Sequence, residues 1–218
     1  MIWFIILEEI LLFIVGMRLI NKNDGEAAIK VSLKEYVAMG LIFVMTGIGL
    51  FSCYGYGREF GCHSLLLYYL IFAAFIDHKT QKIYRIGSIG FILVSMLIFL
   101  FVKGMIWYER MERMLWIMIF SVVSIMQGTL GWMGWGDVLT YIGVFFSLGT
   151  WRYSCMTVEL LAVYMLLANL IFLISNIRNF DWKRKRMKGD EAFLPGMAGA
   201  IILIELVMQN MKWNGGSI

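Results

Sequence analysis

Long apolar runs constrain this chain more than any other feature. Because each helical residue adds about 1.5 Å, roughly 20 residues cross a bilayer core about 30 Å thick. The chain is 61% apolar and 16% charged, whereas soluble domains are roughly 45–50% apolar. We therefore expect an all-α polytopic membrane bundle of about eight transmembrane helices. The expected spans are residues 2–20, 36–53, 64–81, 86–102, 114–130, 132–149, 156–175 and 192–211.

The rest of the composition excludes several classes of protein as candidates for this chain. With three Cys, two His and no C-x-x-C pair, the chain lacks a zinc module or a thioredoxin-like motif. We expect neither a metal nor another cofactor. The net charge of +4 is too small to indicate a nucleic-acid partner. We interpret the first run as a retained helix, because Glu8 and Glu9 interrupt it and no small-residue cleavage site follows before Arg18.

The basic residues predict an orientation in the membrane. With eight spans, thirteen of the nineteen Lys and Arg residues fall on one side, including the strongly basic segment 176–191. Loops rich in Lys and Arg stay in the cytoplasm, so both termini are expected outside a plasma (inner) membrane. We interpret segment 176–191 as an anchor on anionic membrane lipid.

Acidic residues inside spans are costly and mark functional candidates. The apolar stretches 64–76 and 138–149 each cover only about 20 Å of the bilayer core, so their helices must carry Asp77 and Asp137 below the cytoplasmic surface. The helix that holds Asp137 must begin upstream, within the glycine-rich segment 131–136. The two carboxylates are expected at a similar depth. The acidic residues of the spans are Glu8, Glu9, Asp77, Asp137, Glu159 and Glu205.

A pair of carboxylates at one depth has a specific chemistry. Gly134 and Gly136 flank Asp137 in sequence and would let a neighbouring backbone approach closely. Two carboxyl groups in a poorly hydrated site share a proton, so that one acts as a base toward water and the other as an acid toward a carbonyl. The alternative is that each aspartate faces local loop amides or the nearby Lys79 and Lys82.

These residues resemble the type IV prepilin peptidases, the GxGD aspartic proteases that include the archaeal preflagellin peptidases. In that family one Asp ends a helix on the cytoplasmic side and a second lies in a GxGD motif three helices later. Here Asp77 ends the third span, and Gly134-Trp135-Gly136-Asp137 opens the sixth. The segment 192–198, Ala-Phe-Leu-Pro-Gly-Met-Ala, is similar to a late Pro-Phe-Gly-Pro-Phe-Leu-Ala element of the family. The likeness covers roughly residues 60–210.

The resemblance implies a domain organisation and an activity. Residues 1–59 would form two N-terminal helices with a short basic cytoplasmic loop, and residues 60–218 a six-helix peptidase core. Asp77 and Asp137 would be catalytic, with Gly134, Gly136 and Pro195 supporting them. The substrates would be prepilin-like proteins whose short basic leader is cut after a glycine on the cytoplasmic side.

Three sequence differences qualify the resemblance. Ile83-Tyr84-Arg85 replaces the usual Ile-Pro-Asn, and Leu139 replaces a common lysine. Both bear on substrate preference and rate more than on the type of reaction. The first cytoplasmic loop, residues 21–35, lacks the cysteines of the zinc-binding insert found in bifunctional members. We therefore expect no N-methyltransferase activity.

Other interpretations of the same residues stay open. A proton-coupled transporter or channel would use Asp77, Asp137, Glu159 and Glu205 as relay stations. A scaffold of a pilus or secretion system would keep the fold with weakened chemistry. A presenilin-type intramembrane protease fits less well. Ile76 stands where that family has Tyr before its first aspartate, and Pro195-Gly196-Met197 stands where it has Pro-Ala-Leu.

Overall fold

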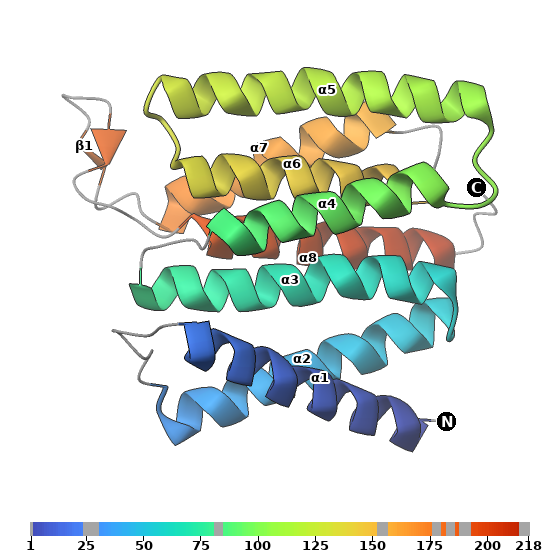
Figure 1. Ribbon diagram of the computed structural model, residues 1–218, viewed down its shortest axis with the longest axis vertical. Helices are drawn as coiled ribbons and strands as arrows, with labels where there is room; N and C mark the ends of the chain where they lie inside the picture. Colours follow the sequence, from blue (N-terminus) through green and yellow to red (C-terminus); the bar gives the residue numbers. More distant parts are fainter. Residues whose placement is uncertain are drawn as a thin grey trace. The chain divides into compact units, whose positions relative to one another are not determined.

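The fold is helical almost throughout. The computed structural model describes residues 2–23, 31–80, 85–151, 157–175, 180–181, 186–187 and 193–213. Within these ranges each of the eight predicted apolar runs forms a helix, which confirms the expected all-helical class (Figure 1). The helices are α1 Ile2–Asn23, α2 Leu33–Tyr54, α3 Arg58–Thr80, α4 Arg85–Phe101, α5 Trp107–Thr129, α6 Trp135–Gly149, α7 Thr157–Ser175 and α8 Leu194–Trp213. Two short antiparallel strands, β1 Phe180–Asp181 and β2 Arg186–Met187, lie within the basic segment.

The lengths and compositions of these helices are those of a membrane protein. Four helices are long and apolar enough to cross a bilayer, namely α2, α3, α5 and α7. Shorter apolar stretches occupy Gly87–Phe101 of α4 and Leu194–Met208 of α8. The expectation of eight crossings stays a prediction. Helix α6 has 15 residues, about 22 Å of helix, which is less than a bilayer core.

The chain divides into two compact units, Met1–Phe72 and Ala73–Ile218, with the boundary inside α3. In the first unit α1 packs against α2. An aromatic cluster fills its interior, with Phe43 stacked on Tyr68 at 4.0 Å between ring centroids. The resemblance implies a different boundary, between residues 59 and 60, where the six-helix peptidase core would begin. That boundary stays a prediction.

In the first unit, the side chains of the adjacent residues Glu8 and Glu9 lie in different environments. Glu9 is 1% exposed, and a Cβ added at Gly47 of α2 would lie 2.6 Å from its carboxyl carbon. Glu9 therefore points into the helix bundle, where Tyr68 of α3 interacts with it. Glu8 instead accepts a hydrogen bond of 3.4 Å from the Tyr56 hydroxyl, just beyond the end of α2. Consecutive residues point about 100° apart on a helix, which accounts for the two environments.

In the second unit α6 is enclosed by its neighbours. It packs against α4, α5 and α7, while α7 packs against α8 (Figure 1). All but four of its residues are buried, which explains how a helix this short is accommodated. Gly143 allows the closest approach, because an added Cβ there would overlap the ring of Phe91 on α4.

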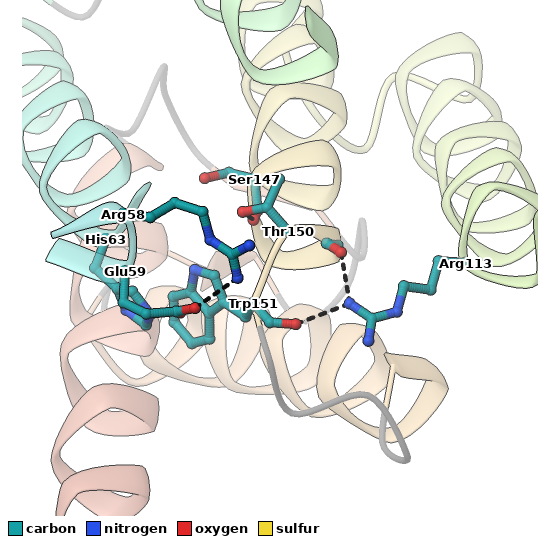
Figure 2. A network of polar contacts seen from close by, with 8 residues as sticks. Arg58, Glu59, His63, Arg113, Ser147, Thr150 and Trp151 are labelled. Carbon is teal, nitrogen blue, oxygen red and sulfur yellow. Dashed lines mark hydrogen bonds and ion pairs between the residues drawn. The ribbon is translucent and has the colours of Figure 1, made fainter. Parts of the chain in front are cut away.

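Hydrogen-bonded arginines explain why α5 begins seven residues before the expected residue 114. Its first turns carry Arg110 and Arg113, and the sequence analysis placed this charged stretch in a loop. Arg113 is 5% exposed and donates hydrogen bonds of 2.8 Å to the carbonyl oxygens of Gly149 and Trp151 (Figure 2). Arg110 donates to the Val102 carbonyl oxygen. Both arginines thus satisfy carbonyl groups at the ends of neighbouring helices, which lack partners within the helix.

The turn between α5 and α6 moves the start of α6 from the expected residue 132 to Trp135. Gly131 adopts a φ of 70°, and its amide donates to the Gly128 carbonyl while the Trp132 amide donates to that of Gln127. This is the Schellman arrangement, in which a glycine in the left-handed region closes the helix end. Residues 130–134 therefore form a turn, and α6 begins only two residues before Asp137.

Candidate functional site

Asp77 lies in the last turn of α3 and is 4% exposed. Its Oδ2 accepts a hydrogen bond of 3.0 Å from the backbone amide of Leu194, and the backbone of Phe193 interacts with the same carboxylate. The Leu194 amide stands at the start of α8, where the first turn of a helix has N–H groups without internal partners. Asp77 therefore caps α8 and joins two segments that are far apart in sequence. The neighbouring Lys79 is exposed, and Lys82 lies outside the described residues.

Asp137 lies in the first turn of α6 and is 8% exposed. The Gly134 backbone interacts with its carboxylate, and a Cβ added at Gly134 would lie 3.1 Å from its Oδ2. The other oxygen, Oδ1, is buried and has no hydrogen-bond partner within the part of the chain that the structure describes. Gly134 thus leaves room for one carboxylate oxygen, and the second is available to another group.

Gly136 contributes through its backbone. Its carbonyl oxygen accepts a hydrogen bond of 3.0 Å from Thr140 Oγ1. The Thr140 hydroxyl also lies 3.4 Å from Ser88 Oγ of α4. These bonds tie the first turn of α6 to the neighbouring helix α4, next to Asp137.

The fold of the second unit brings the two aspartates close enough to interact. The charge of Asp77 acts on Asp137, although 60 residues separate them in the sequence. Asp77 thus joins the end of α3 to the start of α8 and lies within reach of the charge of Asp137 at the start of α6. Two buried carboxyl groups that feel each other's charge can share one proton, which is the requirement for acid–base chemistry on a bound water.

The segment 192–198 forms part of the same region. Phe193 is 6% exposed, and its ring lies 5.8 Å from that of Tyr141. Pro195 is exposed in the first turn of α8, where the missing N–H of proline costs nothing. Gly196 allows close packing on α7, because an added Cβ would lie 3.0 Å from the Ala168 carbonyl oxygen.

Two polar residues near Asp137 were missed by the sequence analysis. Tyr141 is fully buried one helical turn after Asp137, and the charge of Asp137 acts on it. Asn169 of α7 donates a hydrogen bond of 3.3 Å to the Tyr141 hydroxyl. The spacing of four residues from Asp137, and an amide in the middle of a largely apolar helix, are the signals that could have identified them.

The remaining candidates lie elsewhere. Glu159 is exposed in α7, whereas Glu205 of α8 is buried, with 3% of its surface exposed. Among the described residues no group of three or more His, Cys, Asp or Glu could hold a metal ion.

Leu139, which stands where the type IV prepilin peptidases commonly have a lysine, is half-buried in α6. Residues 81–84, which include the first part of the Ile83-Tyr84-Arg85 difference, lie outside the described ranges. The cysteines Cys53 and Cys62 are not in disulfides, and Cys155 lies outside the described residues.

No protein-family model matches this chain, and no curated protein or solved structure matches it.

Proposed function

We propose that this membrane protein is an aspartic endopeptidase with Asp77 and Asp137 as its catalytic pair. The observation that carries the proposal is that both aspartates are buried within the second unit and that Asp137 Oδ1 has no hydrogen-bond partner among the described residues. The substrates would be prepilin-like proteins, cut after a glycine at the end of a short basic leader. The protein would lie in the plasma membrane with its site facing the cytoplasm and its N-terminus outside, and it would have no N-methyltransferase activity.

In the proposed mechanism the two carboxyl groups act on one water molecule. One carboxylate takes a proton from the water, which attacks the scissile carbonyl carbon, while the other carboxylic acid donates a proton to the carbonyl oxygen. The collapse of the tetrahedral intermediate then breaks the C–N bond and returns a proton to the leaving amine. The unpartnered Oδ1 of Asp137 supports this scheme, because it leaves one oxygen of the described site available to hold the water.

One observation favours a second interpretation, a scaffold without catalytic activity. Asp77 accepts a hydrogen bond from the first amide of α8, and a carboxylate can serve as such a cap without any chemistry. In that case replacing Asp77 would lower stability only, and replacing Asp137 would leave the protein's role unchanged. The two interpretations therefore differ in what the Asp137 variant does.

The test is cleavage of a prepilin with a basic leader, co-reconstituted in liposomes with the wild type, Asp77→Asn or Asp137→Asn. Each substitution removes the acid and nearly preserves size, so we expect wild-type cleavage after the leader glycine and a loss of about 100-fold or more in each variant. The exposed Glu159→Gln serves as the matched control and should cleave like the wild type.

Folding of each variant is followed by thermal unfolding in detergent. Cleavage by a folded Asp137→Asn variant would exclude the aspartic mechanism. A folded wild type that cleaves no prepilin would favour the scaffold or the transporter, which proton-flux measurements on the same liposomes then separate.

A further inference from the structure

An aromatic layer crosses the first unit from α1 through α2 to α3. The ring centroids of Phe13 and Phe43 are 5.9 Å apart, and those of Phe43 and Tyr68 are 4.0 Å apart. Further along α2, Tyr54 stacks on His63 with 4.2 Å between ring centroids. Later residues of α2 thus contact earlier residues of α3, so these two helices run antiparallel.

One helical turn from the aromatic layer lies a second, polar layer. Four residues along each helix stand Glu9 on α1, Gly47 on α2 and Ser64 on α3, and residues four apart share a face of a helix. The contact of α1 with α2 agrees with this register, because a Cβ added at Gly47 would lie 2.6 Å from the carboxyl carbon of Glu9. The Tyr68 hydroxyl interacts with both Glu9 and Ser64. Three helices therefore bring a carboxyl group and two hydroxyl groups together.

Three oxygen atoms of the polar layer are buried without a hydrogen-bond partner among the described residues. They are Glu9 Oε2, Ser64 Oγ and the Tyr68 hydroxyl oxygen. A serine hydroxyl within a helix often bonds to the carbonyl oxygen four residues earlier, as Ser52 and Ser124 do here at 2.8 and 3.1 Å. Ser64 makes no such bond, so its oxygen is available to a ligand.

The charge of Glu9 also has no counter-charge in the described part of the chain. Glu9 is 1% exposed and makes no ion pair there. The titratable groups that act on it are Tyr68 and the neighbouring Glu8, neither of which is a cation. Buried charges in proteins are paired or coordinate a metal ion, because an isolated one is very costly. A bridging water would supply hydrogen bonds without balancing the charge, whereas a cation would satisfy both needs.

We propose that Glu9, Ser64 and Tyr68 bind a small monovalent cation such as Na⁺ in the first unit. Carboxylate and hydroxyl oxygens are the ligands that hard cations prefer, and one carboxylate balances a single positive charge. Such a site differs from the groups of three or more His, Cys, Asp or Glu that the described residues lack. Gly47 leaves the room that the carboxyl group occupies. The inference concerns the first unit and does not depend on the proposed peptidase activity.

Binding of radioactive Na⁺ to the whole chain in detergent tests the inference, with choline chloride keeping the ionic strength constant. We expect saturable binding of a single ion per chain. Glu9→Gln should abolish it, because an amide carries no charge. Glu8→Gln is the matched control and should bind like the wild type, since Glu8 instead accepts a hydrogen bond from the Tyr56 hydroxyl. A wild type without saturable binding, or equal binding by Glu9→Gln, would overturn the inference.

Two pairs of variants test the position of the ion. A methyl group in Gly47→Ala overlaps the Glu9 carboxyl group, whereas one in Gly49→Ala meets nothing within 4 Å. Ser64→Ala removes a ligand oxygen, whereas Ser52→Ala removes a hydroxyl bonded to its own helix. We expect the Kd for Na⁺ to rise by about fivefold or more in Gly47→Ala and Ser64→Ala, and to change by less than about twofold in the two controls. The same Kd in all four variants would contradict the proposed site.

Thermal unfolding of the same proteins separates a bound cation from a proton on Glu9. A ligand that binds only the folded state raises its stability. NaCl should therefore raise the Tm of the wild type by about 2 °C or more above its value in choline chloride, and should leave that of Glu9→Gln unchanged. A Tm that varies with pH but is equal in the two salts would show that a proton neutralises Glu9, and the cation site would be wrong.

Discussion

At the scale of single residues, Gly134 controls the space available to Asp137. A Cβ at this position would lie 3.1 Å from Asp137 Oδ2, so Gly134→Ala displaces the carboxylate by a few tenths of an ångström. The backbone of Gly134, with φ −69° and ψ 148°, is open to any residue, and the fold should persist. We expect kcat for prepilin cleavage to fall by about tenfold, since small displacements of a catalytic group are costly.

The matched control for Gly134→Ala is Gly90→Ala in α4. An added Cβ at Gly90 meets nothing within 4 Å, and alanine is a better helix former than glycine by roughly 0.5–1 kcal/mol. Cleavage should stay at the wild-type rate while the unfolding temperature rises slightly. Equal activity in the two alanine variants would show that the methyl group at position 134 does not reach the site.

At the scale of helices, Arg113 secures the end of α6 from α5. Replacing it with leucine leaves the carbonyl oxygens of Gly149 and Trp151 without the donors they have now. We expect Arg113→Leu to lower the free energy of unfolding by about 2–4 kcal/mol, measured in a denaturant titration in mixed micelles. Glu112→Gln, one residue earlier and exposed, should change it by less than about 0.5 kcal/mol.

The packing of α4 on α6 offers a test by rescue. A methyl group at Gly143 overlaps the ring of Phe91, so Gly143→Ala should cost about 1–3 kcal/mol of stability through overpacking. Adding Phe91→Leu to Gly143→Ala removes the overlap and should recover part of that loss. The two changes are in contact, so a coupling energy is expected. If the double variant is as unstable as the sum of the single ones, the two helices do not pack as described.

At the scale of the whole molecule, the direction in which helices cross the membrane is open to measurement. In a variant without native cysteines, single cysteines at Lys34 and Gly57 mark the two ends of α2, and those at Lys103 and Trp132 mark the two ends of α5. The positive-inside rule predicts that an impermeant maleimide labels positions 57 and 103 from outside. Positions 34 and 132 should react only after permeabilisation. The reverse pattern would place the catalytic pair on the outer face and exclude a cytoplasmic leader as substrate.

The sequence alone determined the helices and their approximate bounds. Apolar runs of span length predict a helix with few alternatives, because a backbone in lipid must satisfy its own hydrogen bonds. The start of α2 was also encoded locally, since Ser32 and Glu35 form a capping box. The sequence likewise identified Asp77 and Asp137 as unusual, because a carboxyl group in an apolar run is expensive wherever the helix is placed.

Only the tertiary structure decided what these groups face. No local pattern tells that the Leu194 amide of α8 reaches Asp77, that Arg113 bonds to the end of α6, or that Asn169 donates to Tyr141. Each of these contacts joins residues distant in sequence, and side-chain direction across helices depends on how the helices pack. The sequence therefore shows which groups are costly to bury, whereas the packing of the second unit determines which partners offset that cost.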